Sequence, residues 1–384
     1  MKIGLVIESL DPRRGGVEQW TYQFARHVVT AGHELHVIAQ QFAPAALALG
    51  IVAHRVEAGA SRCAFAAAAE RQARALRLDV VHDTGCGWHC DVFQPHGGSR
   101  TASFEQNLLL TPSWLRSLKR RAAAWLPRYA EFRELTERQY YTQDRIYLAI
   151  SQMVADDLQR YHDVRAEQLR LVYNGVDLTR FSPAHREQHR TVVRALLGVD
   201  ESEVLLLIVA HNFRLKGVPT LLRAAGRLQR AGQPVRVVVA GGKRTRAYEA
   251  LAKRLGVGSA VTFLGAVDDP TPYYAAADVY VQPTFYDPCS LVVLEALASG
   301  LPVVTTRFNG AGELLTAGRE GYVIHDPADD AELAAALTPL MDTARRSAMG
   351  HAARQLAEAH SLERNCREVL AVYQEAATTQ RRAA

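Results

Sequence analysis

A chain of 384 residues, 48% hydrophobic and 22% charged, has the composition of a globular protein and the length of two ordinary domains. This composition excludes a disordered, collagen-like or coiled-coil protein, and a net charge of +5 is too small to indicate nucleic-acid binding by itself. Five scattered cysteines favour a reducing compartment without disulfides. Because the N-terminus lacks signal-peptide features and no apolar run reaches about 18 residues, we expect a cytoplasmic protein that could still lie on a membrane.

Strand and helix patterns alternate through the N-terminal half. Short runs rich in valine and isoleucine predict strands at residues 2–8, 33–40, 78–83, 91–98 and 145–151. Amphipathic segments predict helices at residues 20–32, where Gly32 is the expected C-cap, and at 71–77. Strands separated by helices predict a doubly wound parallel α/β sheet.

The pattern restarts after a strand and turn at residues 169–183, and the polar run 184–191 is the predicted linker. Further strands are predicted at residues 203–210, 235–242, 260–265, 278–284 and 302–306, with helices at 217–232, 247–258 and 290–300. We therefore expect Rossmann-like domains at 1–174 and 175–361. Residues 362–384 should form a helix that returns to the first domain. Such sheets bind ligands at the carboxyl ends of their strands, so we expect a ligand between the two domains.

Two carboxylates bracket an apolar run near the end of the second domain. Asp287 lies in the loop after a predicted strand, and Glu295 lies more than one turn into the following helix. Ser290 is the expected N-cap, and the free N–H groups of Cys289, Ser290 and Leu291 would suit a phosphate. A nucleotide sugar would fit this arrangement. Alternatively, Glu295 is a solvated helix position and Asp287 an ordinary turn residue.

Two cations follow the first strand of the second domain. Arg214 and Lys216 lie in a loop before a helix, where they are well placed for a diphosphate leaving group, unless this is merely a solvated basic loop. In the first domain, Gly15 and Gly16 allow a close backbone approach, although no GxGxxG dinucleotide motif is present. His96 ends a predicted strand and is followed by two glycines. A structural role for it stays open.

The segment 111–132 predicts an amphipathic helix rich in basic residues. One face carries the apolar side chains, and the flanks are basic: Trp114 and Trp125, with Arg116, Lys119, Arg120 and Arg121. This composition favours an interfacial helix that binds anionic lipid. The alternatives are a helix that packs its tryptophans on the domain, or a basic patch that attracts a phosphorylated acceptor.

A cluster of potential zinc ligands follows the third predicted strand. It comprises His82, Cys86, His89 and Cys90. Their spacing matches no standard zinc site, so we expect no metal there. The chain also lacks an Asp-x-Asp cluster at a strand end, so we expect no metal in the reaction.

Several motifs together resemble the family 4 glycosyltransferases, which are retaining enzymes of the GT-B fold. They are GGVEQ, PHGG, YNGVDLTRF, RLKG and DPCSLVVLEALASGLPVV, and the resemblance extends over residues 1–375. Within this family, the chain is most similar to the lipopolysaccharide core glucosyltransferases, which use UDP-glucose. The resemblance implies that Glu295 binds the ribose hydroxyls, Asp287 contacts the donor sugar, and Arg214 and Lys216 bind the donor phosphates.

The resemblance also assigns the remaining residues. The N–H groups of Cys289, Ser290 and Leu291 would complete the diphosphate site, and the base would lie near Val267. Gly15 and Gly16 match the glycine loop near the acceptor and count among the donor-site residues, and His96 would lie near the donor sugar. Asp287 replaces the usual glutamate, and Pro288-Cys289-Ser290 replaces the usual Phe-Gly; both changes fall in the expected sugar pocket.

The resemblance implies a retaining, metal-independent hexosyltransferase without a cofactor. Its partners would be a nucleotide-sugar donor, with UDP-glucose favoured, a glycan or lipid-linked acceptor, and an anionic membrane surface, but no nucleic acid. An acceptor hydroxyl would attack from the front side. Two alternatives remain: a UDP-sugar 2-epimerase on the same fold, and a sugar-binding regulator without catalysis.

Overall fold

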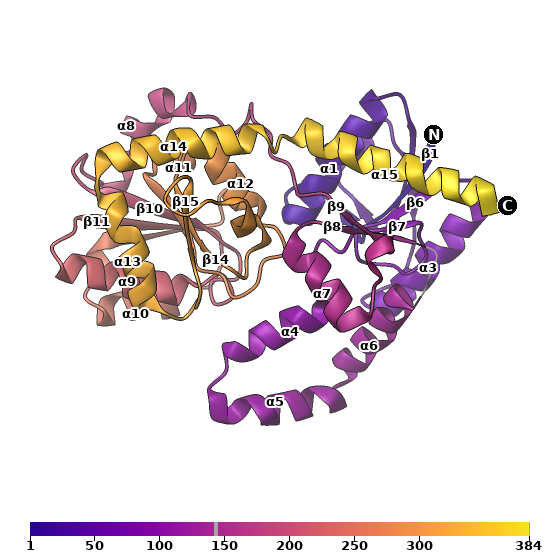
Figure 1. Ribbon diagram of the computed structural model, residues 1–384, viewed down its shortest axis with the longest axis horizontal. Helices are drawn as coiled ribbons and strands as arrows, with labels where there is room; N and C mark the ends of the chain where they lie inside the picture. The colour runs from indigo at the N-terminus through magenta and orange to yellow at the C-terminus, as the bar shows by residue number, and fades with distance from the viewer. Residues whose placement is uncertain (142–144, 384) are drawn as a thin grey trace. The chain divides into compact units, whose positions relative to one another are not determined.

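The computed structural model describes residues 1–141 and 145–383, which form two compact units (Figure 1). The N-terminal unit contains Met1–Tyr173 and the C-terminal helix from Glu363 onwards, and the C-terminal unit contains Asn174–Leu362. No helix in the described part of the chain is both long and apolar enough to cross a bilayer.

The N-terminal unit is built on a seven-stranded parallel sheet in the order β5-β3-β1-β6-β7-β8-β9. Its strands are β1 (Lys2–Val6), β3 (Glu34–Ala39), β5 (Val52–Arg55), β6 (Val80–Asp83), β7 (Val92–Phe93), β8 (Ile146–Ala149) and β9 (Leu169–Leu171), and a separate pair comprises β2 (Ser9–Leu10) and β4 (Gln41–Phe42). Its helices are α1 (Gly16–Thr30), α2 (Pro44–Leu47), α3 (Arg62–Ala75), α4 (Arg100–Leu109), α5 (Ser113–Trp125), α6 (Pro127–Tyr140), α7 (Gln152–His162) and the 3-10 helix η1 (Ala166–Gln168). The central strands are buried and apolar because helices cover both faces of such a sheet.

The C-terminal unit contains a six-stranded parallel sheet in the order β12-β11-β10-β13-β14-β15. Its strands are β10 (Val204–Val209), β11 (Val235–Ala240), β12 (Val261–Gly265), β13 (Val279–Gln282), β14 (Val303–Thr306) and β15 (Gly321–Ile324). Its helices are α8 (His185–Leu197), α9 (Val218–Arg230), α10 (Arg246–Arg254), α11 (Thr271–Ala276), α12 (Leu291–Ala298), α13 (Asp330–Leu337), α14 (Thr343–Glu358), with 3-10 helices η2 (Gly258–Ala260), η3 (Gly310–Leu314) and η4 (Thr338–Met341). Valine and leucine side chains of β10 and β11 pack with α9 and α13 in one core.

Helix starts are where the sequence prediction was least accurate. Helix α1 begins at Gly16, four residues before the predicted start, and the prediction missed this first turn because it opens with Gly16 and Val17, which have low helix propensity. Helix α3 begins at Arg62 instead of residue 71, and the Ser61 hydroxyl caps it by accepting the Ala64 N–H at 3.2 Å. The predicted strand at 91–98 is reduced to the two residues of β7.

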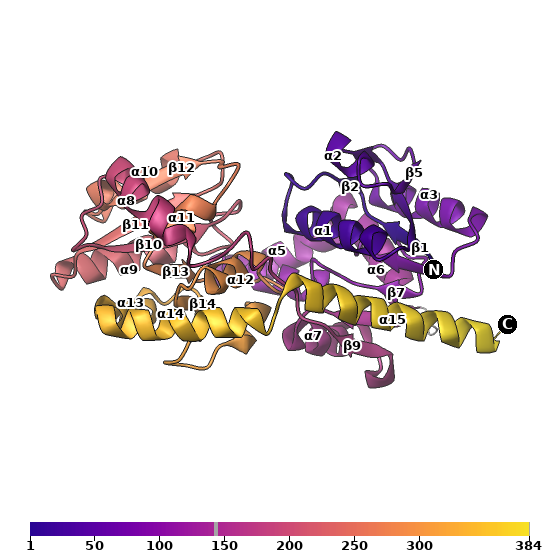
Figure 2. The ribbon, with the colours of Figure 1, turned by 90° about the horizontal axis from the view of Figure 1, so that it is seen from above.

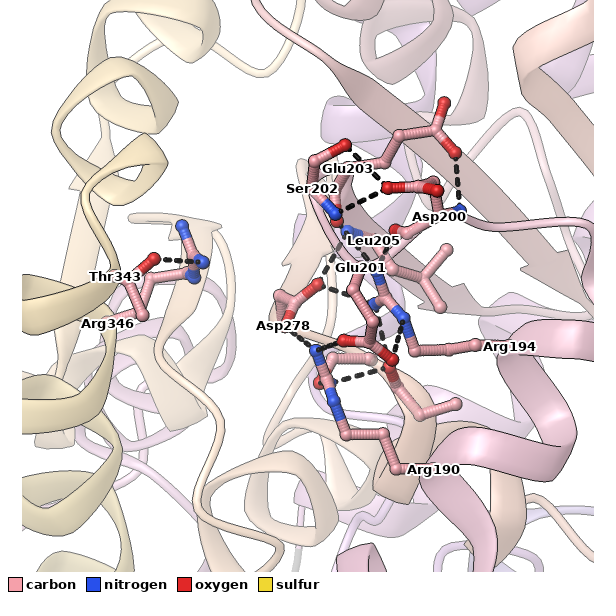
Figure 3. Close-up of polar contacts among 12 residues, drawn as sticks. Arg190, Arg194, Asp200, Glu201, Ser202, Glu203, Leu205, Asp278, Thr343 and Arg346 are labelled. Atoms are coloured by element: carbon pink, nitrogen blue, oxygen red, sulfur yellow. Dashed lines mark hydrogen bonds and ion pairs between the residues drawn. The ribbon is translucent and has the colours of Figure 1, made fainter.

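The predicted linker at 184–191 is wrong, since residues 185–191 are the first seven of helix α8, which also carries Arg194 (Figure 3). The helix is anchored by Arg194, whose side chain is 1% exposed and whose guanidinium lies 2.9 Å from the Asp278 carboxylate. Asp278 also pairs with Arg190 at 2.9 Å and accepts the Leu205 N–H at 2.8 Å. A buried guanidinium needs such a partner, so the ion pair holds α8 against the start of β13.

The C-terminal helix α15 (Leu362–Ala383) packs along the N-terminal unit beside α1 (Figures 1 and 2). The Asn365 side chain accepts the Trp20 indole N–H at 2.8 Å and donates to the Tyr173 carbonyl at 2.8 Å. Further along, the Tyr373 hydroxyl lies 2.5 Å from His82 Nδ1. These buried polar contacts fix the helix on the sheet, and the unit boundary falls between Tyr173 and Asn174.

Candidate active site

Two loops at the carboxyl ends of neighbouring strands form the centre of the site. Strands β10 and β13 are adjacent and parallel, so the loops that follow them emerge side by side. The Phe285 N–H donates to the Leu215 carbonyl at 2.8 Å, which ties the loops together. Gly217 has φ +77°, and a Cβ there would lie 2.0 Å from the Pro283 oxygen, so only glycine permits this approach.

Lys216 and Asp287, predicted separately from the sequence, are in direct contact. The Lys216 ammonium lies 2.5 Å from the Asp287 carboxylate, and their side chains are 21% and 12% exposed. The Asp287 backbone is held by hydrogen bonds to Phe308 and Gly310, in the segment after β14. The pair is therefore a fixed, half-buried charge arrangement. Arg214, two residues before Lys216, is exposed in the same loop.

A buried amide network that the sequence did not predict supports this pair. The Ser290 hydroxyl donates to the Gln282 side chain at 2.9 Å, and the Gln282 amide reaches the Asp287 carboxylate at 3.4 Å. Asn309 accepts the Ser290 N–H at 3.3 Å and donates to Gln282 at 3.4 Å. Since Gln282 ends β13 and Asn309 follows β14, their positions at strand ends were the only signal in the sequence.

The start of helix α12 differs from the prediction in two respects. Ser290 occupies the N-cap position, but its hydroxyl does not cap the helix because it bonds to Gln282. Its N–H is also not free, since Asn309 accepts it. Cys289 is buried, and its carbonyl accepts a hydrogen bond from Asn174 at 2.9 Å. Leu291 is the first residue of the helix and is half-buried.

Glu295 lies in α12, half-buried, with the Tyr274 hydroxyl 2.9 Å from its carboxylate. Burial raises the pKa of this carboxyl to about 7, although the Tyr274 hydrogen bond and the Arg180 charge oppose the shift. Arg180 in turn pairs with Asp269 at 3.3 Å. Glu295 is therefore poised near neutral pH, which is unusual for a solvated helix position.

A hollow of about 430 Å³ lies beside Arg180 and Asp269. It is also lined by Asp177, His185 and His189 from the segment before and within α8. Val267, the predicted base contact, lies half-buried in the loop after β12, two residues before Asp269. This hollow is lined by polar and charged side chains, which offer hydrogen-bond donors and acceptors to a ligand.

His96, predicted near the donor sugar, lies in a turn after β7 of the N-terminal unit. Its ring packs on Trp20 with centroids 4.4 Å apart, and burial lowers its pKa to about 3, so the imidazole is neutral. Its Nε2 is buried without a hydrogen-bond partner among the described residues. Such an unsatisfied atom is costly, which marks His96 as a candidate ligand contact.

Gly15 and Gly16 lie at the start of α1 in the N-terminal unit. Gly15 is the N-cap residue and Gly16 the first helical residue. The Gly15 backbone is extended, with φ 179°, so its conformation does not itself require glycine. A Cβ on Gly15 would lie 3.0 Å from the Glu18 carboxylate, which is a tight contact.

Helix α5 exposes its apolar face. Trp114, Leu118 and Trp125 are 77%, 63% and 89% exposed, so the alternative that the tryptophans pack on the domain is wrong. Among its basic residues, Arg120 pairs with Glu105 at 2.5 Å, which reduces the predicted positive charge. Arg116 donates a hydrogen bond to the Thr111 carbonyl, and Lys119 donates one to the Thr111 hydroxyl. Arg121 is exposed.

The potential zinc ligands have other neighbours. His82 bonds to Tyr373, and the Cys86 sulfur lies 3.3 Å from the Thr84 hydroxyl. The Cys90 sulfur lies 3.6 Å from the Arg145 guanidinium. Within residues 1–141 and 145–383, no three His, Cys, Asp or Glu side chains are grouped so as to hold a metal ion.

Two family models match the chain. Residues 14–180 match Glycosyltransferase Family 4, and residues 203–343 match Glycosyl transferases group 1. A D-inositol 3-phosphate glycosyltransferase of Geodermatophilus obscurus is 31% identical, over 94% of this chain and 85% of its own length. One from Corynebacterium urealyticum is also 31% identical, over 64% of this chain, and the chain spans only 60% of that relative. The lipopolysaccharide glucosyltransferase WaaG of Escherichia coli is 29% identical, over 61% of this chain and 63% of its own length.

Solved structures show the same architecture. A crystal structure of WaaG, a glycosyltransferase involved in lipopolysaccharide biosynthesis, superposes with a TM-score of 0.78 at 22% identity and covers 98% of both chains. Anabaena HepE in complex with UDP-glucose superposes with a TM-score of 0.73 at 18% identity and covers 99% of both chains. At these identities the structures establish the fold alone. The chain belongs to glycosyltransferase family 4 and has the GT-B fold.

Proposed function

We propose that this protein transfers a hexose, with glucose favoured, from a UDP-sugar to a hydroxyl of a glycan or glycolipid in cell-envelope biosynthesis. The observation that carries the proposal is the Lys216–Asp287 pair, fixed at the carboxyl edge of the C-terminal sheet in a family 4 chain. The name of WaaG, a lipopolysaccharide glucosyltransferase, supports the acceptor class, whereas the other relatives are named for inositol 3-phosphate, which is not a glycolipid. HepE was crystallised with UDP-glucose, which supports the donor.

The donor would lie along the C-terminal unit with its diphosphate at Lys216. The ammonium would bind a phosphate oxygen while Asp287 keeps it in place, and Arg214 would add a second charge from the same loop. The Glu295 carboxylate would accept hydrogen bonds from the ribose hydroxyls. Asp287 would also contact the donor sugar, with its carboxylate already oriented by Lys216.

The proposed chemistry depends on charge rather than on a strong acid. When the glycosidic bond of the donor breaks, the UDP oxygen gains negative charge, which Lys216 and Arg214 would stabilise. We propose that the acceptor hydroxyl attacks from the same face and passes its proton to a donor phosphate oxygen, which retains the anomeric configuration. A cofactor is not part of this scheme, and neither is a metal ion. The expected role of His96 stays a prediction.

We also propose that the protein acts at the cytoplasmic face of a membrane. The exposed Trp114, Leu118 and Trp125 would enter the lipid interface, and the exposed Arg121 would meet anionic headgroups. Sedimentation with anionic vesicles should carry wild-type protein down, and the double variant Trp114→Ala/Trp125→Ala should stay in solution. Equal sedimentation of both proteins would contradict this part of the proposal.

Incubation with UDP-glucose and a de-glucosylated envelope glycolipid tests the main proposal. We expect UDP release that depends on the acceptor, an α-linked glucose in the product by NMR, and the same rate with EDTA. Conversion of UDP-glucose alone to its 2-epimer would favour the epimerase instead. Binding of UDP-glucose without turnover in the presence of every acceptor would favour a regulator.

A further inference from the structure

A cavity of about 850 Å³ lies within the N-terminal unit and is lined by residues of α4, α5 and α6. Figure 1 shows these three helices extending from the unit. Its floor is aromatic, and the rings of Phe104 and Tyr129 meet edge to face with centroids 5.4 Å apart. Gly97 and Gly98, which directly follow His96, line its inner end. The cavity therefore reaches the turn that contains the candidate site residue of this unit.

Two arginines in this cavity share one aromatic ring. The guanidinium carbons of Arg62 and Arg100 lie 5.0 and 5.1 Å from the centroid of Phe132. Arg100 also donates to the Gly85 carbonyl at 3.1 Å. In the described part of the chain, neither guanidinium forms an ion pair with a carboxylate, although both are half-buried. Burial, followed by the charge of Arg62, lowers the pKa of Arg100.

The remaining charges of the cavity do not balance this pair. Lys119 and Arg133 also line the cavity, and Lys119 bonds to the neutral Thr111 hydroxyl. Arg120 is already paired with Glu105. Glu137 is the single acid among the described lining residues. Arg62, Arg100 and Lys119 thus exceed the acidic charge, and two like charges near one ring repel each other unless an anion lies between them.

We infer that this cavity binds an acceptor that carries a phosphate group on a ring scaffold, with the phosphate held by Arg62 and Arg100. Guanidinium groups match phosphate oxygens in geometry, and the aromatic floor suits the flat face of a sugar or polyol ring. The inference rests on the proposed function and adds the acceptor's charge. The same phosphate chemistry occurs in a soluble sugar phosphate and in the headgroup of a phosphorylated glycolipid.

Calorimetry on the full-length protein tests this inference with inositol 1-phosphate and with inositol as its neutral counterpart. Wild-type protein should bind the phosphate compound at least about tenfold more tightly, and Arg62→Gln/Arg100→Gln should lose about that factor. The matched control is Arg138→Gln, because Arg138 also stacks on a ring, Trp88 at 4.5 Å, but does not line the cavity. This control should bind like wild type.

A second arm separates the two sources of phosphate. Vesicles that contain phosphatidic acid should displace inositol 1-phosphate from the cavity if a lipid headgroup is the natural ligand. Displacement by soluble phosphate compounds alone identifies a free sugar phosphate. Either result supports the inference. Equal binding of inositol and inositol 1-phosphate, or an equal loss in the Arg138→Gln control, overturns it.

Two further measurements keep the test decisive. If the double variant does not fold, Lys119→Gln at an exposed position should still weaken inositol 1-phosphate binding several-fold. UDP-glucose affinity should be unchanged in all of these variants, because Lys216 and Glu295 are intact. Absent UDP-glucose binding in wild-type protein would therefore count against the proposed function, whereas absent phosphate discrimination counts against this inference.

Discussion

Glu295 gives the most detailed prediction about donor binding. Burial raises the pKa of its carboxyl to about 7, and the ionised form is the one that would accept hydrogen bonds from ribose hydroxyls. With this pKa, about one-tenth of the protein is ionised at pH 6 and about nine-tenths at pH 8. The observed affinity for UDP-glucose should therefore rise about tenfold over this interval.

The variant Glu295→Gln isolates the effect, because its amide cannot ionise. Its affinity should be weaker than that of wild type at pH 8 and nearly independent of pH. Calorimetry should use UDP-glucose and not UDP, whose terminal phosphate itself titrates near pH 6. The reasoning is refuted if both proteins show the same pH dependence, or if wild-type affinity falls as the pH rises.

The raised pKa of Glu295 makes donor affinity rise with pH, but it makes the stability of the fold fall with pH. The unfolded glutamate has the ordinary pKa of 4.5, so between this value and about 7 the folded protein holds a proton that the unfolded chain has lost. Stability from this group therefore falls as the pH rises through that window. Glu295→Gln should gain stability relative to wild type from pH 5 to pH 8, measured as the shift of the denaturation midpoint.

Two further predictions concern the C-terminal unit. Asp278→Ala should lower its unfolding free energy by about 3–5 kcal/mol because a buried guanidinium loses its partner, whereas Glu201→Ala, an exposed acid of the same network, should cost under about 1 kcal/mol. Circular dichroism is the appropriate probe, because all four tryptophans lie in the N-terminal unit and their fluorescence would not report on the C-terminal unit. Equal losses of unfolding free energy in the two variants would contradict the role of burial. Gly217→Ala should cost well over the ~1–2 kcal/mol of a left-handed alanine, because its Cβ would meet Pro283 at 2.0 Å. Gly256 also has a left-handed backbone, with φ +76°, but a Cβ there would meet no neighbouring atom. Gly256→Ala should therefore lower the unfolding free energy only by the backbone strain, and similar losses in the two variants would argue against the clash at Gly217.

Much of the fold follows from local patterns in the sequence. Strands such as β10 and β11 were predicted well because buried parallel strands are continuous apolar runs. Helix α8 was missed although its sequence contains good helix formers and ends at Gly198, a left-handed C-cap. The polar first half, 184–191, was interpreted separately from the apolar second half, and the ion pair with Asp278, 84 residues from Arg194, could not be predicted from local sequence.

The candidate site was predictable to the extent that it follows strand ends. Lys216 and Asp287 are 71 residues apart, yet both follow adjacent parallel strands, so their proximity was a reasonable expectation. The partners of Ser290 were not predictable, because a serine at an N-cap position gives no sign that Gln282 and Asn309 will bind it instead. Such choices depend on packing between distant segments.

The most direct test of the account is the affinity of UDP-glucose for Lys216→Ala at pH 8. We expect a loss of about tenfold or more relative to wild type, because the half-buried ammonium at the strand edge would no longer bind the diphosphate. Lys253→Ala, at an exposed position on α10 of the same unit, should bind like wild type. Equal affinity of wild type and Lys216→Ala would contradict the account.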